Sequence, residues 1–166
     1  MAIAYEIIPT LTAATITLNS LASSTTTGRQ ATAITFRDGS NRVAPDLSIV
    51  LDVGLTTGSL GGDNSVHLWL ARSMDGSVYE TGLPAVGASD AAFTFTATPV
   101  GTSPTASEFQ YIGSIRFTGQ SQTKRKVFRV RGVPRAGVFV VLNNSGIALA
   151  GSGQTLNYAQ LTPEIV

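Results

Sequence analysis

Apolar and polar residues alternate along most of this chain, and this period of two constrains the fold more than any other feature. Apolar residues alternate strictly with threonine in segments 15–18 and 93–98, and the pattern returns in segment 32–36. Successive side chains of a strand point to opposite faces, so the pattern predicts half-buried β-strands. Segments 47–53 and 66–70 are predicted core strands, because branched apolar residues occupy one whole face of each.

Four further segments complete the predicted strands: 111–118, 126–130, 138–142 and 155–161. Segment 138–142 is apolar on both faces and is predicted to lie in the middle of a sheet. No window has the spacing of a long amphipathic helix, so we expect at most a short helix around Leu18 to Ser24. Segments 81–92 and 99–108 have the composition of long surface loops.

These patterns predict an all-β protein with one domain over residues 1–166. About eight or nine short strands separated by turn residues indicate an antiparallel β-sandwich, either a jelly roll or an Ig-like fold. The start of the chain lacks the basic region and long apolar core of a secretory signal. Residues 1–12 are predicted to be an extended N-terminal arm, with a first strand of the sandwich as the alternative.

The composition excludes several classes of function. The chain has no cysteine, so zinc–thiolate sites, iron–sulfur clusters and thiol nucleophiles are excluded. The longest apolar run has five residues, 138–142, which is too short to span a membrane as a helix. Only 13% of the residues are charged, while 16 Ser and 21 Thr supply much of the polar surface. We expect no cofactor, no metal and no membrane partner.

Charge is distributed unevenly along the sequence. Residues 1–108 have four bases and nine acids, whereas residues 109–163 have seven bases and no acid. Alternation sends Arg125, Arg129 and Arg131 to one face of a strand and Phe128 and Val130 to the other. We call the three arginines the arginine row; it predicts either a protein-binding surface or a charged edge strand that discourages unwanted sheet pairing. Nucleic acid is not an expected partner, because the net charge is only +1.

No sequence motif for catalysis is present. The single histidine, His67, lies in a predicted core strand and is expected to be packed there; as a catalytic base it would need a nucleophile and an orienting acid nearby. Segment 151–155 looks superficially like a phosphate-binding loop, but it lacks the lysine and the following helix, so a tight turn is predicted.

Several loop residues match weak site patterns. The acids Asp63, Asp75, Glu80 and Asp90 could bind calcium but lack EF-hand spacing, so solvated loops are expected. Residues 143–145 match a glycosylation sequon, which we interpret as a chance match.

Two sets of apolar or aromatic residues are candidate binding surfaces. Trp69 and Tyr79 could form a platform on which a sugar stacks. Trp69 alternates out of phase with its leucine neighbours, so it fits either a strand buried on both faces or an exposed aromatic residue. The predicted arm supplies the second set, a possible protein interface formed by Ile3, Tyr5, Ile7 and Ile8.

Five segments of the chain resemble small structural proteins of tailed-bacteriophage virions. They are 18–23 and 28–34 near the N-terminus, 70–79 in the middle, and 137–146 and 148–153 towards the C-terminus. The resemblance implies a non-enzymatic virion component with a β-sandwich fold, and it carries over no catalytic residue.

The sequence is compatible with three functions. The first is a capsid decoration or cement protein that binds the major capsid protein, or other virion proteins, and stabilises the head shell; the resemblance implies a homo-oligomer, with a trimer as the natural guess. The second is a neck, tail or fibre component that binds host glycans. The third, a glycan-hydrolysing enzyme, rests only on the versatility of the fold. We expect the first and expect no enzyme activity.

Overall fold

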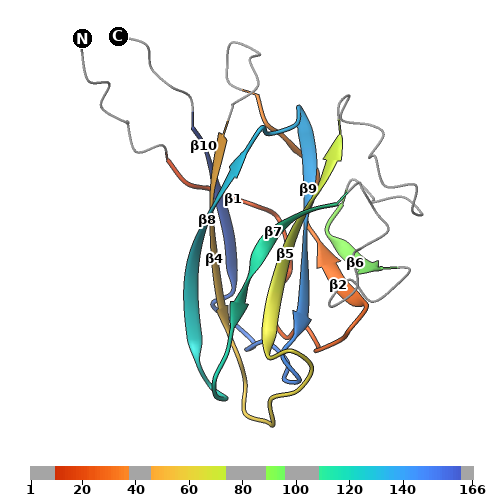
Figure 1. The fold of residues 1–166 in the computed structure, drawn as a ribbon, viewed down its shortest axis with the longest axis vertical. Helices are drawn as coiled ribbons and strands as arrows, with labels where there is room; N and C mark the ends of the chain where they lie inside the picture. Colours follow the sequence, from red (N-terminus) through yellow and green to blue (C-terminus); the bar gives the residue numbers. More distant parts are fainter. Residues whose placement is uncertain (1–9, 38–45, 74–88, 96–108, 162–166) are drawn as a thin grey trace.

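The computed structural model describes residues 10–37, 46–73, 89–95 and 109–161, and within them it contains strands and no helix. The predicted all-β, antiparallel sandwich is confirmed (Figure 1). The strands of this part of the chain are β1 (Thr12–Ala13), β2 (Thr27–Gln30), β3 (Ile34–Thr35), β4 (Asp46–Gly54), β5 (Ser65–Ser73), β6 (Ala91–Thr94), β7 (Phe109–Arg116), β8 (Thr123–Arg131), β9 (Ala136–Asn144) and β10 (Thr155–Leu161).

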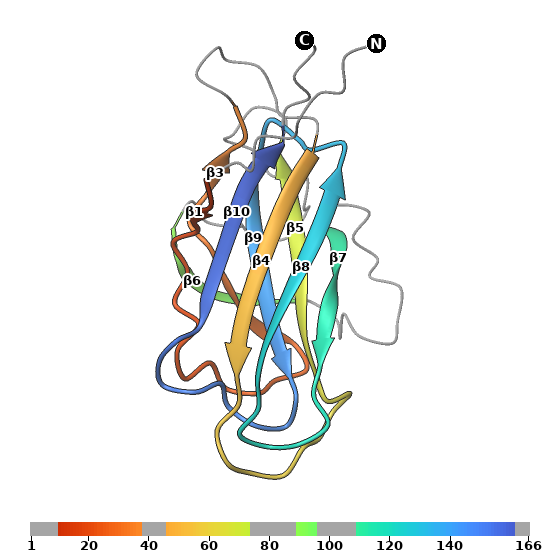
Figure 2. The same cartoon turned by 90° about the vertical axis from the view of Figure 1, so that its left-hand side faces the viewer.

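The strand pairs are nested along the chain. The first strand pairs with the last, β2 with β9, β4 with β8, and β5 with β7. This long antiparallel ribbon is rolled so that β10 also pairs with β4, and β9 with β5. The result is a four-stranded sheet in the order β1-β10-β4-β8 and a second sheet in the order β6-β2-β9-β5-β7, with β3 also paired to β9 (Figure 2). A rolled, nested ribbon is a jelly roll, so the Ig-like alternative is wrong.

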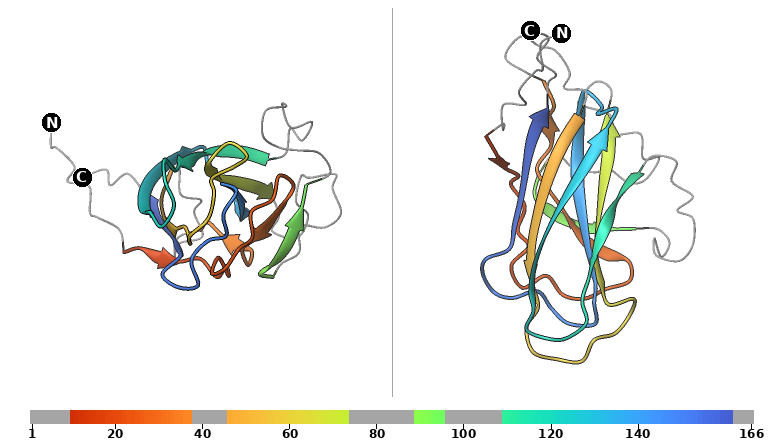
Figure 3. Two further views of the ribbon diagram at one scale, coloured as in Figure 1. Left: turned by 90° about the horizontal axis from the view of Figure 1, so that it is seen from below. Right: turned by 60° about the vertical axis from the view of Figure 1, so that its left-hand side comes forward.

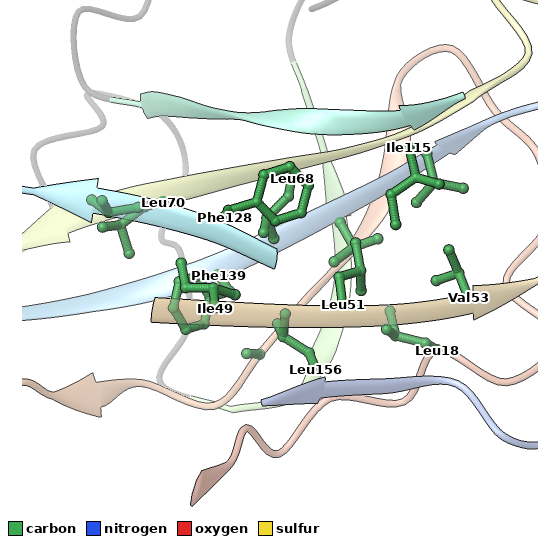
Figure 4. Packing of buried hydrophobic residues seen from close by; sticks show 14 of the residues in the cluster. Leu18, Ile49, Leu51, Val53, Leu68, Leu70, Ile115, Phe128, Phe139 and Leu156 are labelled. Atoms are coloured by element: carbon green, nitrogen blue, oxygen red, sulfur yellow. The ribbon is translucent and has the colours of Figure 1, made fainter. Parts of the chain in front are cut away.

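The main core lies between the two sheets and is built by alternation. Every second residue of the long strands points inward: the four-stranded sheet contributes Leu47, Ile49, Leu51, Val53, Phe128, Val130 and Leu156, and the second sheet contributes Val66, Leu68, Leu70, Ile115, Phe139 and Val141 (Figure 4). Each fully buried leucine or phenylalanine contributes about 1.5–3 kcal/mol of hydrophobic stabilisation. The end-on view in Figure 3 shows the strands surrounding this interior.

A second apolar cluster covers the outer face of the second sheet. It contains Trp69 and Ala71 of β5, Val138, Val140 and Leu142 of β9, and three phenylalanines, Phe93, Phe95 and Phe109. Strand β9 therefore has apolar neighbours on both faces, and all nine of its residues are buried. This confirms that 138–142 lies in the middle of a sheet, between β2 and β5.

The N-terminal part of the sequence was interpreted less accurately. Residues 15–18 alternate in burial as predicted, with Leu18 buried, but they form no strand. The pattern detects an extended chain with one buried side, and it cannot detect whether a neighbouring strand completes a ladder. The short helix predicted at Leu18 to Ser24 is also wrong: a single turn closes there, with the Leu21 amide donating to the Leu18 carbonyl at 3.1 Å.

Strand β2 was missed because its sequence has turn composition. Its second residue, Gly28, packs directly against the backbone carbonyl of Val141 on β9, in a position where a Cβ atom would collide with that oxygen. Glycine is used here for close approach between two backbones, and not for a turn.

Candidate functional site

The arginine row lies on an edge of the sandwich. Strand β8 is the last strand of the four-stranded sheet, and its residues Arg125, Arg129 and Arg131 are exposed. Phe128 and Val130 point into the core, so the predicted alternation is observed. Val127, on the same outer face as the arginines, is 60% exposed.

Acids of β4 neutralise most of this row. Arg125 donates two hydrogen bonds to Asp52, at 2.6 and 3.1 Å, and Arg129 donates two to Asp46, at 3.3 and 3.0 Å. The hydrogen bond from Arg125 lowers the pKa of Asp52 below its ordinary value, with a smaller contribution from the Thr155 hydroxyl. Two acids of the acidic half thus pair with two bases of the basic half across adjacent strands. The three arginines of the row thus face two carboxylates, those of Asp46 and Asp52.

Arg131 is the residue that remains unneutralised. It lies opposite Asp46 in the strand register, but that carboxylate is bonded to Arg129, and Arg131 makes no ion pair with the described residues. Among the described residues, the outer face of the four-stranded sheet therefore presents one surplus positive charge, Arg131, four residues along β8 from the exposed Val127. This is the part of the predicted arginine row with unused binding capacity.

The two lysines of β8 point to the other side of the strand and reach across the sandwich. The Lys124 ammonium donates to the backbone carbonyl of Arg116, and that of Lys126 to the carbonyl of Ser114, both at 2.7 Å. Each also lies over a phenylalanine ring, 5.5 Å from the centroid of Phe117 and 5.1 Å from that of Phe128. Both carbonyls belong to β7, the edge strand of the second sheet, so the lysines occupy acceptors that another strand could otherwise use.

Little of the predicted arm can be placed. Its residues Ile3, Tyr5, Ile7 and Ile8 lie outside the described residues, as does Tyr79 of the predicted sugar platform. The described chain begins at residue 10, and β1 pairs with β10 at Thr12 and Ala13. Leu11, just before this pairing, is 49% exposed.

Trp69 is buried, with 2% of its surface exposed. It lies in the second apolar cluster, where its ring is 5.2 Å from that of Phe95 and 5.4 Å from that of Tyr111. Of the two alternatives for Trp69, the strand buried on both faces is correct and the exposed aromatic is wrong. A ring covered by Phe95 cannot stack on a sugar.

Tyr111 is the exposed aromatic residue beside it, and sequence reasoning missed its role. It is 50% exposed and lies opposite Trp69 in the register of β5 and β7. That register shifts by one residue at a bulge, because Leu68 pairs with Gly113 while the next residue of β5 pairs with Tyr111. Since alternation counts residues along one strand, it cannot detect the bulge that sets this pairing.

His67 joins Tyr111 to an acid. Its Nε2 lies 2.6 Å from Oδ2 of Asp63, and its Nδ1 lies 3.2 Å from the Tyr111 hydroxyl. The imidazole is 6% exposed, and burial lowers its pKa although the charge and hydrogen bond of Asp63 act in the opposite direction. This lowering favours the neutral ring at pH 7. Asp63 is held in place because its Oδ1 accepts the Ser65 amide at 3.0 Å.

The other candidate sites have structural explanations. Segment 151–155 is a bend at the end of the ten-residue connection between β9 and β10, and not a tight turn between strands; the Gln154 side chain holds it by donating to the carbonyls of Ala150 and Ser152 and accepting the Gly54 amide. Asn143 of the sequon is fully buried, and its amide donates to the carbonyls of Leu21 and Ile147. It is not accessible for glycosylation in the folded protein.

The acids considered for calcium are dispersed. Asp63 belongs to the histidine contact above, and Asp90 accepts hydrogen bonds from Arg29 and Thr17. Asp75 and Glu80 lie outside the described residues. Among the residues that the structure describes, no group of three or more His, Asp or Glu side chains could hold a metal ion, and no helix could cross a membrane.

Comparison with known proteins adds no relative. No family model matches the chain, and no curated protein matches its sequence.

Proposed function

We propose that this chain is a non-enzymatic structural protein of a bacteriophage virion, a decoration or cement protein that binds the major capsid protein and stabilises the head shell. The single observation that carries the proposal is the outer face of the four-stranded sheet. There Val127 is exposed, Arg131 makes no ion pair with any residue that the structure describes, and Arg125 and Arg129 are held in place by carboxylates.

Such a face is suited to docking on a protein. Arginines fixed by Asp46 and Asp52 lose little conformational freedom when a partner binds, and an apolar side chain among them can be desolvated. Arginine is also enriched at protein interfaces. The fold is compatible with the proposal, because jelly rolls occur in viral capsid and lectin domains, although a fold alone does not assign a function.

The resemblance of five sequence segments to virion proteins is the reason for proposing a capsid protein as the partner. Few charged side chains, hydroxyl-rich strands and a predicted apolar arm suit a subunit that is held in an assembly in many copies. A homo-oligomer, for which a trimer is the simplest form at local threefold positions, belongs to the same proposal.

The experiment measures binding to shells that lack this protein. We expect the added chain to bind at hundreds of copies per shell and to raise the temperature at which the shell opens. Val127→Asp and Arg131→Glu should each reduce occupancy at least tenfold. Arg116→Glu, an identical charge reversal on the exposed end of β7 in the other sheet, is the matched control and should bind normally. Equal loss in all three variants, or unchanged shell stability, contradicts the proposal.

The alternative is a neck, tail or fibre component. It is distinguished by copy number, since closed assemblies at those positions hold a dozen copies or fewer. Of the proposed glycan contacts, Trp69 is buried and Tyr79 lies outside the described residues; among the residues that the structure describes, Tyr111 is the exposed aromatic residue on this face.

A further inference from the structure

Three polar side chains form a connected line on the outer face of the second sheet: Asp63, His67 and Tyr111. The carboxylate lies 2.6 Å from one ring nitrogen of His67, and the phenol lies 3.2 Å from the other. They come from three places in the fold, the loop before β5, β5 itself and β7. The docking face proposed above lies on the other sheet and uses none of them.

The direction of the hydrogen bonds follows from the acid. An ionised carboxylate can only accept, so the ring proton of neutral His67 is assigned to Nε2, which faces Asp63. Nδ1 then carries a lone pair, and the Tyr111 hydroxyl donates to it. A hydroxyl that donates to an imidazole, whose other nitrogen is fixed by an acid, is the arrangement that makes a hydroxyl nucleophilic in acyl-transfer sites.

The hydroxyl is both accessible and fixed. Tyr111 is 50% exposed, whereas His67 is 6% exposed, so an external reagent meets the phenol and not the imidazole. The Tyr111 ring packs against Trp69, with centroids 5.4 Å apart, and against His67 at 6.1 Å. Tyr158, the other described tyrosine, packs between Phe36 and Phe139, and burial raises its pKa. Burial alone is therefore expected to make Tyr158 react slowly, and the role of His67 is tested on Tyr111 itself.

We propose that Tyr111 is an acceptor site for covalent acylation, with His67 as the base and Asp63 as its positioning residue. The substrate class is an uncharged activated ester. The side-chain contacts described for Tyr111 and His67 are aromatic or acidic and include no lysine or arginine, so they offer no cation to neutralise a phosphoryl group.

The reaction is a single acyl transfer. The Tyr111 oxygen attacks the carbonyl carbon of the ester while its proton passes to Nδ1 of His67. A new carbon–oxygen bond forms to Tyr111, and the bond to the leaving alcohol or phenol breaks, with the electron pair departing on that oxygen. Asp63 stabilises the resulting imidazolium, which then loses its proton to the solvent or to the leaving group. The product is an O-acyl tyrosine, and no oxidant or metal is required.

The test treats the full chain with 4-nitrophenyl acetate at pH 7.5 and maps acetylation by peptide mass spectrometry. Neutral hydroxylamine removes acetyl from tyrosine oxygen but not from lysine, which separates the two products. We expect a hydroxylamine-labile acetyl group on Tyr111 that forms faster than on Tyr5, Tyr79 or Tyr158, and none at this position in Tyr111→Phe. Acetylation of Tyr111 at the rate of the other tyrosines overturns the proposal.

Variants at the other two positions test the role of the base. His67→Gln keeps the size and the hydrogen bonding but removes the basic nitrogen, and should slow acetylation of Tyr111 about 100-fold. Asp63→Asn should slow it about tenfold, because the imidazolium is then less stabilised. An unchanged rate in folded His67→Gln overturns the proposal.

A pH profile decides the matter even if His67→Gln fails to fold. Among the described residues, the charged or titratable groups in contact with His67 are Asp63 and Tyr111, and its register partner on β9 is Leu142. With His67 as base, the rate at Tyr111 rises as the imidazole loses its proton and then reaches a plateau below pH 8. A rate that instead rises tenfold per pH unit through pH 8 indicates an unassisted phenol and overturns the proposal.

Discussion

The two sheets of the jelly roll share one core but have opposite kinds of outer face. The four-stranded sheet turns a polar face outward, where carboxylates of β4 pair with arginines of β8. The second sheet turns an aromatic face outward, and Trp69 on that face is buried under Phe95. Side chains alternate between the two faces in both sheets, but the four-stranded sheet has one buried face and the second sheet has two. The contribution of an outward-facing side chain to stability therefore depends on whether other residues cover that face of the sheet.

The largest expected contrast compares one outward residue of each sheet. Trp69→Ala removes a large buried ring from the aromatic face and should lower the free energy of unfolding by about 3–5 kcal/mol. Val127→Ala on the polar face should change it by less than about 0.5 kcal/mol, because Val127 is 60% exposed. Urea unfolding followed by circular dichroism measures both. Similar losses in the two variants would contradict the contrast between the faces.

Buried and exposed amides give the next contrast. Asn143→Ala removes one donor from each of the carbonyls of Leu21 and Ile147, which keep the Leu149 amide and the Ser145 hydroxyl as donors, and it leaves the Ser145 amide without its acceptor. A buried group left unpaired costs about 1–3 kcal/mol, so we expect a loss of that size. Asn157→Ala, on β10 of the four-stranded sheet, removes one exposed hydrogen bond to Thr155 and should cost under about 1 kcal/mol. Equal effects at the two sites would show that the Asn143 network is not fully formed.

Two glycines sharpen the comparison at the level of the backbone. The Cβ atom of Gly28→Ala meets the Val141 carbonyl, which belongs to the ladder of β2 and β9 and cannot move alone, so we expect a loss of about 1–3 kcal/mol. The Cβ atom of Gly54→Ala meets the hydroxyl of Thr123 at 3.0 Å, and that side chain can rotate away. This second variant should be nearly neutral. Thermal unfolding of both variants is the measurement, and we expect Gly28→Ala to unfold at a lower temperature than Gly54→Ala. The opposite order would contradict the prediction.

The smallest expected effects are on the pH dependence of stability, to which one titratable residue of each face contributes in a different pH range. Burial lowers the pKa of His67 from its ordinary 6.5, so below that pH the unfolded chain binds more protons than the folded chain. Stability contributed by neutral His67 is present above pH 6.5 and is lost as the pH falls through the folded pKa. The hydrogen bond from Arg125 lowers the pKa of Asp52 from 3.8, so the contribution of Asp52 is lost only in a more acidic window, below 3.8.

Unfolding in urea at a series of pH values tests this separation. His67→Gln should reduce the loss of stability that begins below pH 6.5 and leave unchanged the loss that begins below pH 3.8, which we call the acidic slope. Asp52→Asn should reduce the acidic slope and leave unchanged the loss that begins below pH 6.5. The acidic slope should be reduced and not abolished, because the pKa of Asp90 is also lowered: its hydrogen bonds with Arg29 and Thr17 outweigh the opposing effect of burial. A slope below pH 6.5 that persists in His67→Gln would contradict the assignment to this histidine.

Much of the fold could be predicted from the residues. The long strands β4, β5, β9 and β10 lie close to the predicted segments, because alternation is a local property that survives any sheet order. The failures have a common cause. Strand β2 and the extended segment 15–18 were misjudged because forming a ladder requires a neighbour that is distant in sequence, such as β9.

The candidate sites were predictable to a lesser extent. The exposure of Arg125, Arg129 and Arg131 follows from alternation, but their neutralisation by Asp46 and Asp52 depends on the pairing of β4 with β8, some 80 residues apart in the case of Arg129 and Asp46. The contact of His67 with Tyr111 depends on a bulge between β5 and β7. Neither pairing leaves a signal within a short stretch of sequence.

The sequence by itself determined the class of the protein: a cysteine-free β-sandwich with hydroxyl-rich strands and charge concentrated in two halves of opposite sign. Only the tertiary structure decided that the pairs are nested into a jelly roll, that Trp69 is covered and Tyr111 exposed, and that Arg125 and Arg129 pair with Asp52 and Asp46. The physical reason is that alternation is set by backbone geometry within one strand, whereas burial and charge pairing are set by the strands that come to lie beside it.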